Sequence, residues 1–148
     1  MIYTELTKKA MLIACNAHHG QHDKSGFPYI FHPYHLAEQM NDEISVCVAL
    51  LHDVVEDTDI TIHELENKFP PEITEAVKLL TYNGKEDYFD YIRRLKTNPY
   101  AKLVKIADLT HNLDQSRLLN TDDIPEYKRA YWKEKYTHAY EILTENKL

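Results

Sequence analysis

Apolar residues recur at the three- and four-residue spacing of amphipathic helices along almost the whole chain. The helices that this spacing predicts span about residues 3–18, 33–40, 43–56, 71–80, 86–96, 99–119 and 125–145, with a short one begun by Thr61. The Asn83-Gly84 pair has helical patterns on both sides rather than alternating strands. The pattern therefore predicts an all-α fold, a single domain over residues 1–148 built as a bundle of about seven to eight helices.

The predicted helix at residues 43–56 is apolar on nearly every face, which is typical of a central, buried helix. It nevertheless contains His52 and Asp53, and ionisable groups there are costly unless they are paired or bind a metal. Glu56 and Asp57 follow four residues later, so the four polar groups project from neighbouring faces. A divalent cation would relieve the repulsion among the three carboxylates. The alternative, from this segment alone, is the polar edge of a core helix.

Two further residues extend the candidate metal site. His32 directly precedes Pro33 at the start of a predicted helix, and Asp108 lies within an apolar helical stretch. Taken singly, His32 is explained by a structural hydrogen bond and Asp108 by a helix surface. Together, the order His, His-Asp, Asp matches the ligand set of the HD superfamily of phosphohydrolases. Mixed imidazole and carboxylate ligands suit Mn²⁺, Fe²⁺ or Mg²⁺ better than a structural zinc, which favours cysteine.

Three motifs narrow the resemblance. Residues 17–33 contain AHHGQ, KSGFPYI and HP, residues 49–58 read ALLHDVVEDT, and residues 105–112 contain KIAD followed by HN. In this order they resemble the motifs of the RelA/SpoT-type alarmone hydrolase domain, and the similarity covers about residues 10–120. The chain is too short for the synthetase and regulatory domains of the long enzymes. It therefore looks like a stand-alone small alarmone hydrolase.

The resemblance implies metal-dependent hydrolysis of the 3′-pyrophosphate of guanosine tetra- or pentaphosphate, (p)ppGpp, with Mn²⁺ as the usual metal. By the same resemblance the metal ligands are His32, His52, Asp53 and Asp108. Glu56 and Asp57 would handle the attacking water, with Glu56 as the expected general base. Lys24, Ser25 and Asn112 would contact the phosphorylated nucleotide substrate.

The chain departs from the family pattern at two places. Asp23 stands where the family usually has an arginine that packs on the purine, and an acid cannot make that contact and repels phosphates. In the third motif, Leu109 and Thr110 replace Arg-Leu. We therefore expect hydrolysis of guanosine tetraphosphate with relaxed base preference and a poor KM, and we expect Asp23→Arg to lower that KM.

The composition of the chain excludes some classes of function. With 24 acidic and 17 basic residues the formal charge is −7, which argues against non-specific nucleic-acid binding, although a metal and a few local cations still create a positive pocket. No apolar run approaches the ~20 residues of a membrane span, and no secretory signal is visible at the N-terminus. Cys15 and Cys47 are expected to be buried, reduced thiols. These features predict a cytoplasmic protein without a membrane partner.

Other polar residues have ordinary structural explanations beside functional ones. His18 and His19 close the first predicted helix, where an imidazolium interacts favourably with the helix dipole. Lys105 is explained by a solvated helix face or by phosphate binding, and Arg117 is a further phosphate candidate. Trp132 and the tyrosines of the last helix are expected in the core or at an interface, although one of them would be able to stack on a base.

Two alternatives to an alarmone hydrolase stay open. One is an HD-domain phosphohydrolase that acts on another nucleotide or phosphoester. The other is a non-catalytic nucleotide or metal sensor on an HD scaffold. Against the sensor, all four ligands and the Glu56-Asp57 pair are present together, whereas a decayed enzyme would be expected to lose at least one. The pattern does not predict an oligomeric state.

Overall fold

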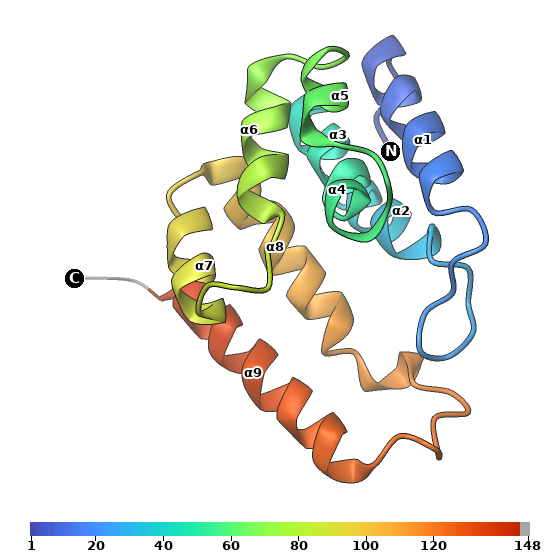
Figure 1. Ribbon diagram of the computed structural model, residues 1–148, viewed down its shortest axis with the longest axis vertical. Coiled ribbons are helices and arrows are strands. Elements are labelled where there is room, and N and C mark those ends of the chain that lie inside the picture. The colour runs from blue at the N-terminus through green and yellow to red at the C-terminus, as the bar shows by residue number, and fades with distance from the viewer. Residues whose placement is uncertain (146–148) are drawn as a thin grey trace.

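The computed structural model describes residues 1–145, which form nine α-helices and one 3₁₀ turn (Figure 1). In chain order they are α1 (Glu5–Ala17), α2 (Phe31–Glu38), α3 (Glu43–Leu51), α4 (Val54–Asp57), α5 (Ile62–Glu66), α6 (Pro71–Leu80), α7 (Tyr88–Leu95), α8 (Pro99–Asn112), η1 (Gln115–Arg117) and α9 (Glu126–Thr144). Within these residues the extended structure is limited to one isolated bridge between His22 and Pro28. The all-α prediction is confirmed.

Helix α3 is the centre of the bundle, as its apolar composition predicted. It packs against α1, α2, α6 and α8, and every residue from Ser45 to Leu51 is buried (Figure 1). Asp42 caps its N-terminus by accepting a hydrogen bond from the Ser45 amide at 2.8 Å. The central helix therefore fixes the position and direction of the chain that leaves it at Leu51.

The predicted helix at residues 43–56 is divided in two, and this is the main correction to the expected fold. His52 and Asp53 lie in the break between α3 and α4, where the Asp53 backbone has φ −108° and ψ 0°. No glycine or proline marks this position, so the periodicity continued through it. The break changes the directions of the two side chains, and the pair lies at the end of a buried helix rather than along its face.

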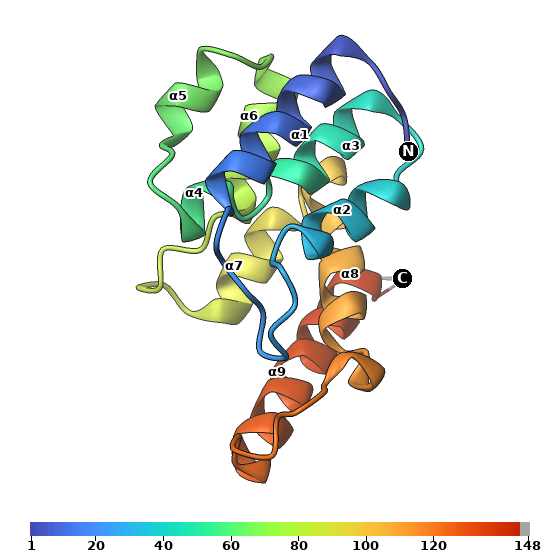
Figure 2. The same ribbon diagram turned by 90° about the vertical axis from the view of Figure 1, so that its right-hand side faces the viewer.

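Helix α8 ends at Asn112, seven residues before the predicted end at Leu119. Asp114 accepts a hydrogen bond from the Ser116 amide at 3.0 Å and begins the turn η1. The α1–α2 loop reaches this segment, as Figure 2 shows, because the Ser25 hydroxyl donates to the Arg117 carbonyl at 2.7 Å. The same hydroxyl accepts from the Leu119 amide at 3.0 Å. Two segments more than ninety residues apart are thereby joined beside the site.

Most helix starts follow the predicted capping residues. Thr61 and Asn98 accept hydrogen bonds from the first turns of α5 and α8, and Pro71 opens α6. Helix α9 packs along α8 and α7 (Figure 1). Both cysteines are free, but Cys15 is exposed and only Cys47 is buried, so the expected burial of Cys15 is wrong. In the described part of the chain, no helix has the length and apolar character needed to cross a bilayer.

Candidate metal centre

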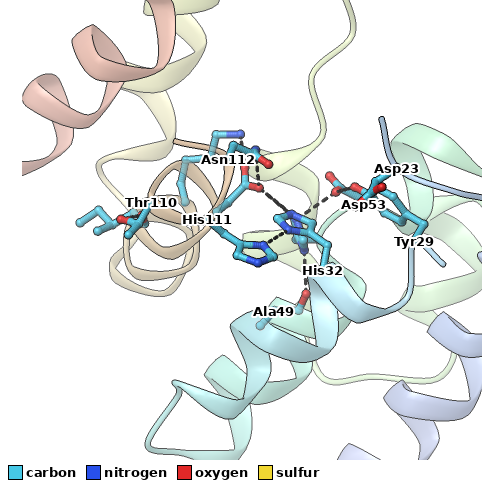
Figure 3. Close-up of polar contacts among 12 residues, drawn as sticks. Asp23, Tyr29, His32, Ala49, Asp53, Thr110, His111 and Asn112 are labelled. Atoms are coloured by element: carbon cyan, nitrogen blue, oxygen red, sulfur yellow. Dashed lines mark hydrogen bonds and ion pairs between the residues drawn. The ribbon is translucent and has the colours of Figure 1, made fainter. Parts of the chain in front are cut away.

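The four predicted metal ligands come from three parts of the fold and lie together. His32 lies in α2, His52 and Asp53 occupy the break after α3, and Asp108 lies in α8. In Figure 3, His32 lies between Asp53 on one side and His111 with Asn112 on the other. The contacts of α3 with both α2 and α8 bring these residues to one point. His32, His52 and Asp108 are buried, and Asp53 is mostly so.

The distances within this cluster are those expected between ligands of one ion. His32 Nε2 lies 2.8 Å from Asp108 Oδ1, and His52 Nε2 lies 3.0 Å from Asp53 Oδ2 and 3.7 Å from Asp108 Oδ1. Donor atoms of His32, His52 and Asp53 all lie within 4.8 Å of one another. Ligands that are each about 2.1 Å from a common ion lie about 3 Å apart. The spacing therefore fits a coordination shell.

His52 provides the clearest test of whether a metal fits. Its Nδ1 donates to the Ala49 carbonyl at 2.7 Å, which leaves the lone pair on Nε2. That Nε2 atom is buried and has no hydrogen-bond partner of acceptable geometry, although two carboxylate oxygens face it. A buried nitrogen of this kind is costly unless something fills its lone pair. The donor set, two imidazoles and two carboxylates, fits a divalent cation.

The electrostatics of the cluster favour a positive charge at its centre. Burial alone would lower the pKa of His52, but Asp53 and Asp108 together raise it well above its usual value. Burial alone would raise the pKa of Asp53, but His52 holds it at about 2. The carboxylates are thus ionised and attract a cation, and a divalent ion competes with the proton for the same imidazole nitrogen.

Three residues form hydrogen bonds to the carboxylates of Asp53 and Asp108. The Tyr29 hydroxyl donates to Asp53, and Lys105 Nζ and Asn112 Nδ2 donate to Asp108 at 2.7 and 3.1 Å. Burial would raise the pKa of Asp108, but the Lys105 ammonium holds it well below its usual range. These contacts orient the carboxylate oxygens toward the cluster, as partners of metal ligands generally do.

His111 positions the ligand His32. Its Nδ1 lies 2.7 Å from His32 Nδ1, and the two rings are stacked with centroids 5.0 Å apart (Figure 3). Burial, followed by the positive charge of Arg117, lowers the pKa of His111 to about 4, so His111 is neutral. We assign the shared proton to His32 Nδ1, because His111 then accepts it and His32 Nε2 keeps its lone pair for the cluster.

This assignment predicts that His111→Ala binds metal about 10- to 100-fold more weakly, because His32 loses the partner that fixes its tautomer and ring orientation. His111→Gln retains an acceptor and is expected to restore part of the affinity. Competition with a chromophoric chelator measures the affinity, and His63→Ala, which removes an exposed imidazole from α5, is the control. Unchanged affinity in His111→Ala would show that His32 needs no such support.

Glu56 and Asp57 form a second group of carboxylates beside the ligands. Their oxygens and an oxygen of Asp53 lie within 4.8 Å of one another. The Tyr82 amide donates to Glu56 Oε1 at 2.7 Å and holds that side chain at the edge of the cluster. Partial burial, with the Asp53 and Asp57 charges in addition, raises the pKa of Glu56 to about 7 despite this hydrogen bond. Such a carboxyl group is able to exchange a proton near neutral pH.

Three cavities adjoin one another in this region, with the smallest between the other two in terms of shared lining residues. The middle cavity, of about 240 Å³, contains the ligand carboxylates together with Glu56 and Asp57. A cavity of about 310 Å³ adjoins it and shares Tyr29 and Asn112 with it. A third cavity, of about 560 Å³, shares Tyr82, Tyr88 and Lys135 with the middle one. The two outer cavities have no lining residue in common.

The predicted substrate contacts line the 310 Å³ cavity, which we call the loop-side cavity. Lys24, Ser25 and Asn112 all contribute to its wall. The Lys24 ammonium lies 3.5 Å from the centroid of the Trp132 ring. The Ser25 hydroxyl donates a hydrogen bond to the Arg117 carbonyl and accepts one from the Leu119 amide. Trp132, expected in the core or at an interface, therefore serves as the support of a candidate substrate lysine.

The two departures from the family pattern have different consequences. Leu109 is buried in the core, and Thr110 is exposed and points away from the cluster in Figure 3, so neither faces the site. Asp23 Oδ1 accepts the amides of Ser25 and Phe27 at 2.9 and 3.0 Å and so shapes the loop. Its other oxygen lies 3.6 Å from Arg117 Nη2, so its charge is compensated.

Several residues of the site were not assigned a role from the sequence. Tyr29 and His111 lie within the quoted motifs, but their contacts to Asp53 and His32 join segments far apart in the chain. His18 closes α1 as expected, but it is buried, and its Nδ1 lies 2.8 Å from Gln21 Oε1. The spacing of residues along one helix does not predict the contacts of Tyr29 and His111, because these contacts depend on how separate segments pack together.

The comparisons with known proteins agree with this geometry. The family model described as HD domain matches residues 10–133. The chain is 36% identical over 121 residues to the bifunctional (p)ppGpp synthase/hydrolase SpoT of Escherichia coli (strain K12), covering 72% of this chain and 17% of that protein. It is 34% identical over 127 residues to a GTP pyrophosphokinase of Myxococcus xanthus, covering 74% and 17%. The chain thus spans less than a fifth of these relatives.

A solved structure described as "A metazoan ortholog of SpoT hydrolyzes ppGpp and plays a role in starvation responses" has the same fold. Its TM-score is 0.76 at 24% identity, covering 98% of this chain and 95% of that one. The HD-domain match includes the four clustered residues and most of the chain. The chain therefore belongs to the HD-domain family, and its relatives are proteins of the RelA/SpoT type.

Proposed function

We propose that this chain is a metal-dependent phosphohydrolase that removes the 3′-pyrophosphate from guanosine tetra- or pentaphosphate. The observation that carries the proposal is the buried cluster of two histidines and two aspartates, with His52 Nε2 lacking a partner, beside a cavity lined by Lys24, Ser25 and Asn112. The name of the Escherichia coli relative, which includes (p)ppGpp hydrolysis, supports this choice of substrate.

His32, His52, Asp53 and Asp108 would hold the ion. When bound, the ion supplies positive charge that polarises the phosphoryl group and acidifies water. Imidazole and carboxylate donors together favour Mn²⁺, with Fe²⁺ or Mg²⁺ as alternatives. Tyr29 and Lys105, in the wall of the middle cavity, orient the carboxylates of Asp53 and Asp108.

The remaining residues bind the nucleotide and move a proton. In the loop-side cavity, Lys24 is a cation for phosphate oxygens, and Asn112 lies between this cavity and the cluster. Glu56 accepts a proton from the attacking water as the new oxygen–phosphorus bond forms. The bond from phosphorus to the ribose 3′ oxygen breaks, and that oxygen gains a proton in exchange for the one that Glu56 has accepted. Guanosine tetraphosphate and water thus give guanosine 5′-diphosphate and pyrophosphate.

Arg117 provides the cation that Asp23 cannot. Its guanidinium lies in the wall of the loop-side cavity, anchored by Asp23 and by a 2.7 Å bond from Nη1 to the His111 carbonyl. We expect Arg117→Met to raise KM for guanosine tetraphosphate about three- to thirtyfold, with little change in kcat, because a stacked or phosphate-bound guanidinium is lost. Steady-state kinetics measure this, and an unchanged KM would exclude the role.

Asp23→Arg is no longer expected to lower KM. That replacement would add a cation but also remove both hydrogen bonds that shape the Lys24-Ser25-Gly26 loop. Asp23→Asn is the variant that tests the charge of Asp23 alone. Its amide oxygen still accepts hydrogen bonds from both backbone amides, while the negative charge is lost.

A phosphate-release screen tests the proposal against its two alternatives. The protein is assayed on a panel of nucleotides and phosphoesters, including guanosine tetraphosphate and its adenine analogue, with Mn²⁺ and Mg²⁺ supplied separately. We expect guanosine tetraphosphate to be cleaved fastest, with Mn²⁺. Faster cleavage of another phosphoester would support the first alternative. Metal binding without any turnover would support a sensor.

A further inference from the structure

Lys135 is a cation of the middle cavity that the proposed function has not yet used. It lies on α9 and lines both the middle cavity and the 560 Å³ cavity, which we call the α9-side cavity. Its Nζ lies 4.2 Å from the centroid of the Tyr88 ring and about 6 Å from those of Tyr131 and Tyr136. Aromatic faces therefore hold the ammonium group at the junction of the two cavities.

The charge of Lys135 is not compensated by a carboxylate among residues 1–145, because no ion pair within 4.0 Å involves it. The other lysine of the middle cavity, Lys105, is committed to Asp108 at 2.7 Å. Lys135 is thus the cation of this cavity that remains available for an anion. Partial burial, followed by the charge of Lys105, lowers the pKa of Lys135, which is consistent with a cation that gains from an anionic partner.

The arrangement of the cavities indicates which anion Lys135 would bind. The predicted nucleotide contacts line the loop-side cavity, the ligand carboxylates line the middle cavity, and Lys135 lines the middle and α9-side cavities but not the loop-side cavity. Cleavage at the ribose 3′ oxygen releases pyrophosphate, which has to leave the cluster on a side that the nucleoside does not occupy. The side with Lys135 meets this condition.

We propose that Lys135 is a pyrophosphate-binding residue, which holds the distal phosphate of the 3′-pyrophosphate during cleavage and the released pyrophosphate afterwards. This inference rests on the proposed function. The anion is held at the junction and not deeper in the α9-side cavity, because Glu86, Asp87 and Glu134 line that cavity and repel it. Of these, Glu86 is paired with Arg94. Figure 1 shows α7 and α9, which carry this junction, side by side.

The test measures the binding of inorganic pyrophosphate and of guanosine 5′-diphosphate separately, by calorimetry at fixed free Mg²⁺. We expect Lys135→Met to weaken pyrophosphate binding about 10- to 100-fold, the effect of a lost charge-assisted hydrogen bond, and to leave the diphosphate nucleotide unchanged. Lys135→Arg is expected to retain most of the affinity and shows that the fold is intact. Lys133→Met is the matched control, since Lys133 is exposed on the same helix and lines neither cavity.

Equal pyrophosphate affinity in Lys135→Met and the parent protein would overturn the inference, as would an equal loss for both ligands. The binding measurement needs no turnover. If the parent protein binds pyrophosphate through Lys135 but does not cleave guanosine tetraphosphate, the proposed substrate is wrong while the anion site stands. If it cleaves that substrate and Lys135→Met binds pyrophosphate normally, only the anion site is wrong.

Discussion

Replacing Asp53 by alanine is expected to remove bound metal and hydrolysis together. Asp53 Oδ2 lies 3.0 Å from His52 Nε2, and Tyr29 orients the carboxylate toward the cluster. The variant loses one of two anionic ligands, and His52 then faces a site with less negative charge. We expect metal content after gel filtration to fall from about one ion per chain to near zero, with turnover at background.

Elemental analysis and turnover, measured on the same samples, check this prediction. Asp59→Ala is the control, because Asp59 is an exposed acid six residues further along the chain and belongs to neither group of clustered donors. A folded Asp53→Ala protein that keeps a full complement of metal and its activity would show that Asp53 is not a ligand.

Glu56→Gln is expected to keep the metal and lose about 10²–10⁴ in kcat, the usual contribution of a positioned general base. The amide keeps the shape of the side chain and can still accept the Tyr82 amide through its oxygen. Calorimetric metal binding should be unchanged. Glu66→Gln, an exposed position on α5, is the control.

Glu56→Gln also tests how the hydrolytic activity depends on pH. The base works only when deprotonated, and the pKa of Glu56 is about 7 before a cation binds nearby, so activity should rise with pH through a limb at or below about 7. This limb should be absent in Glu56→Gln. A variant that hydrolyses at the parental rate would assign Glu56 a structural role and make Asp57 the candidate base.

Local patterns along the chain predicted most of the helices and the residues of the cluster. The apolar spacing and the capping residues Thr61, Asn98 and Pro71 correspond to observed helix starts. His52, Asp53 and Asp108 were selected because ionisable groups in apolar helices need a partner, and His32 by its position before Pro33 and by the order of the HD-superfamily ligands. Their presence in one cluster follows from the packing of α2 and α8 against α3.

The remaining features depend on tertiary contacts that no local pattern encodes. Neither the break at His52 and Asp53 nor the end of α8 at Asn112 is marked by a glycine or a proline. The sequence alone predicts an uncompensated charge at Asp23, because its partner Arg117 lies far along the chain. No sequence pattern marks Lys135, because its position in the middle cavity depends on how α9 packs beside the cluster.

The most direct test of the central claim is product analysis of guanosine tetraphosphate incubated with the Mn²⁺-loaded protein. Chromatography with mass detection should find guanosine 5′-diphosphate and pyrophosphate in equal amounts, formed by the parent protein and not by Asp53→Ala. Release of single phosphates, or an unchanged substrate with metal bound, would contradict the assignment as a 3′-pyrophosphohydrolase.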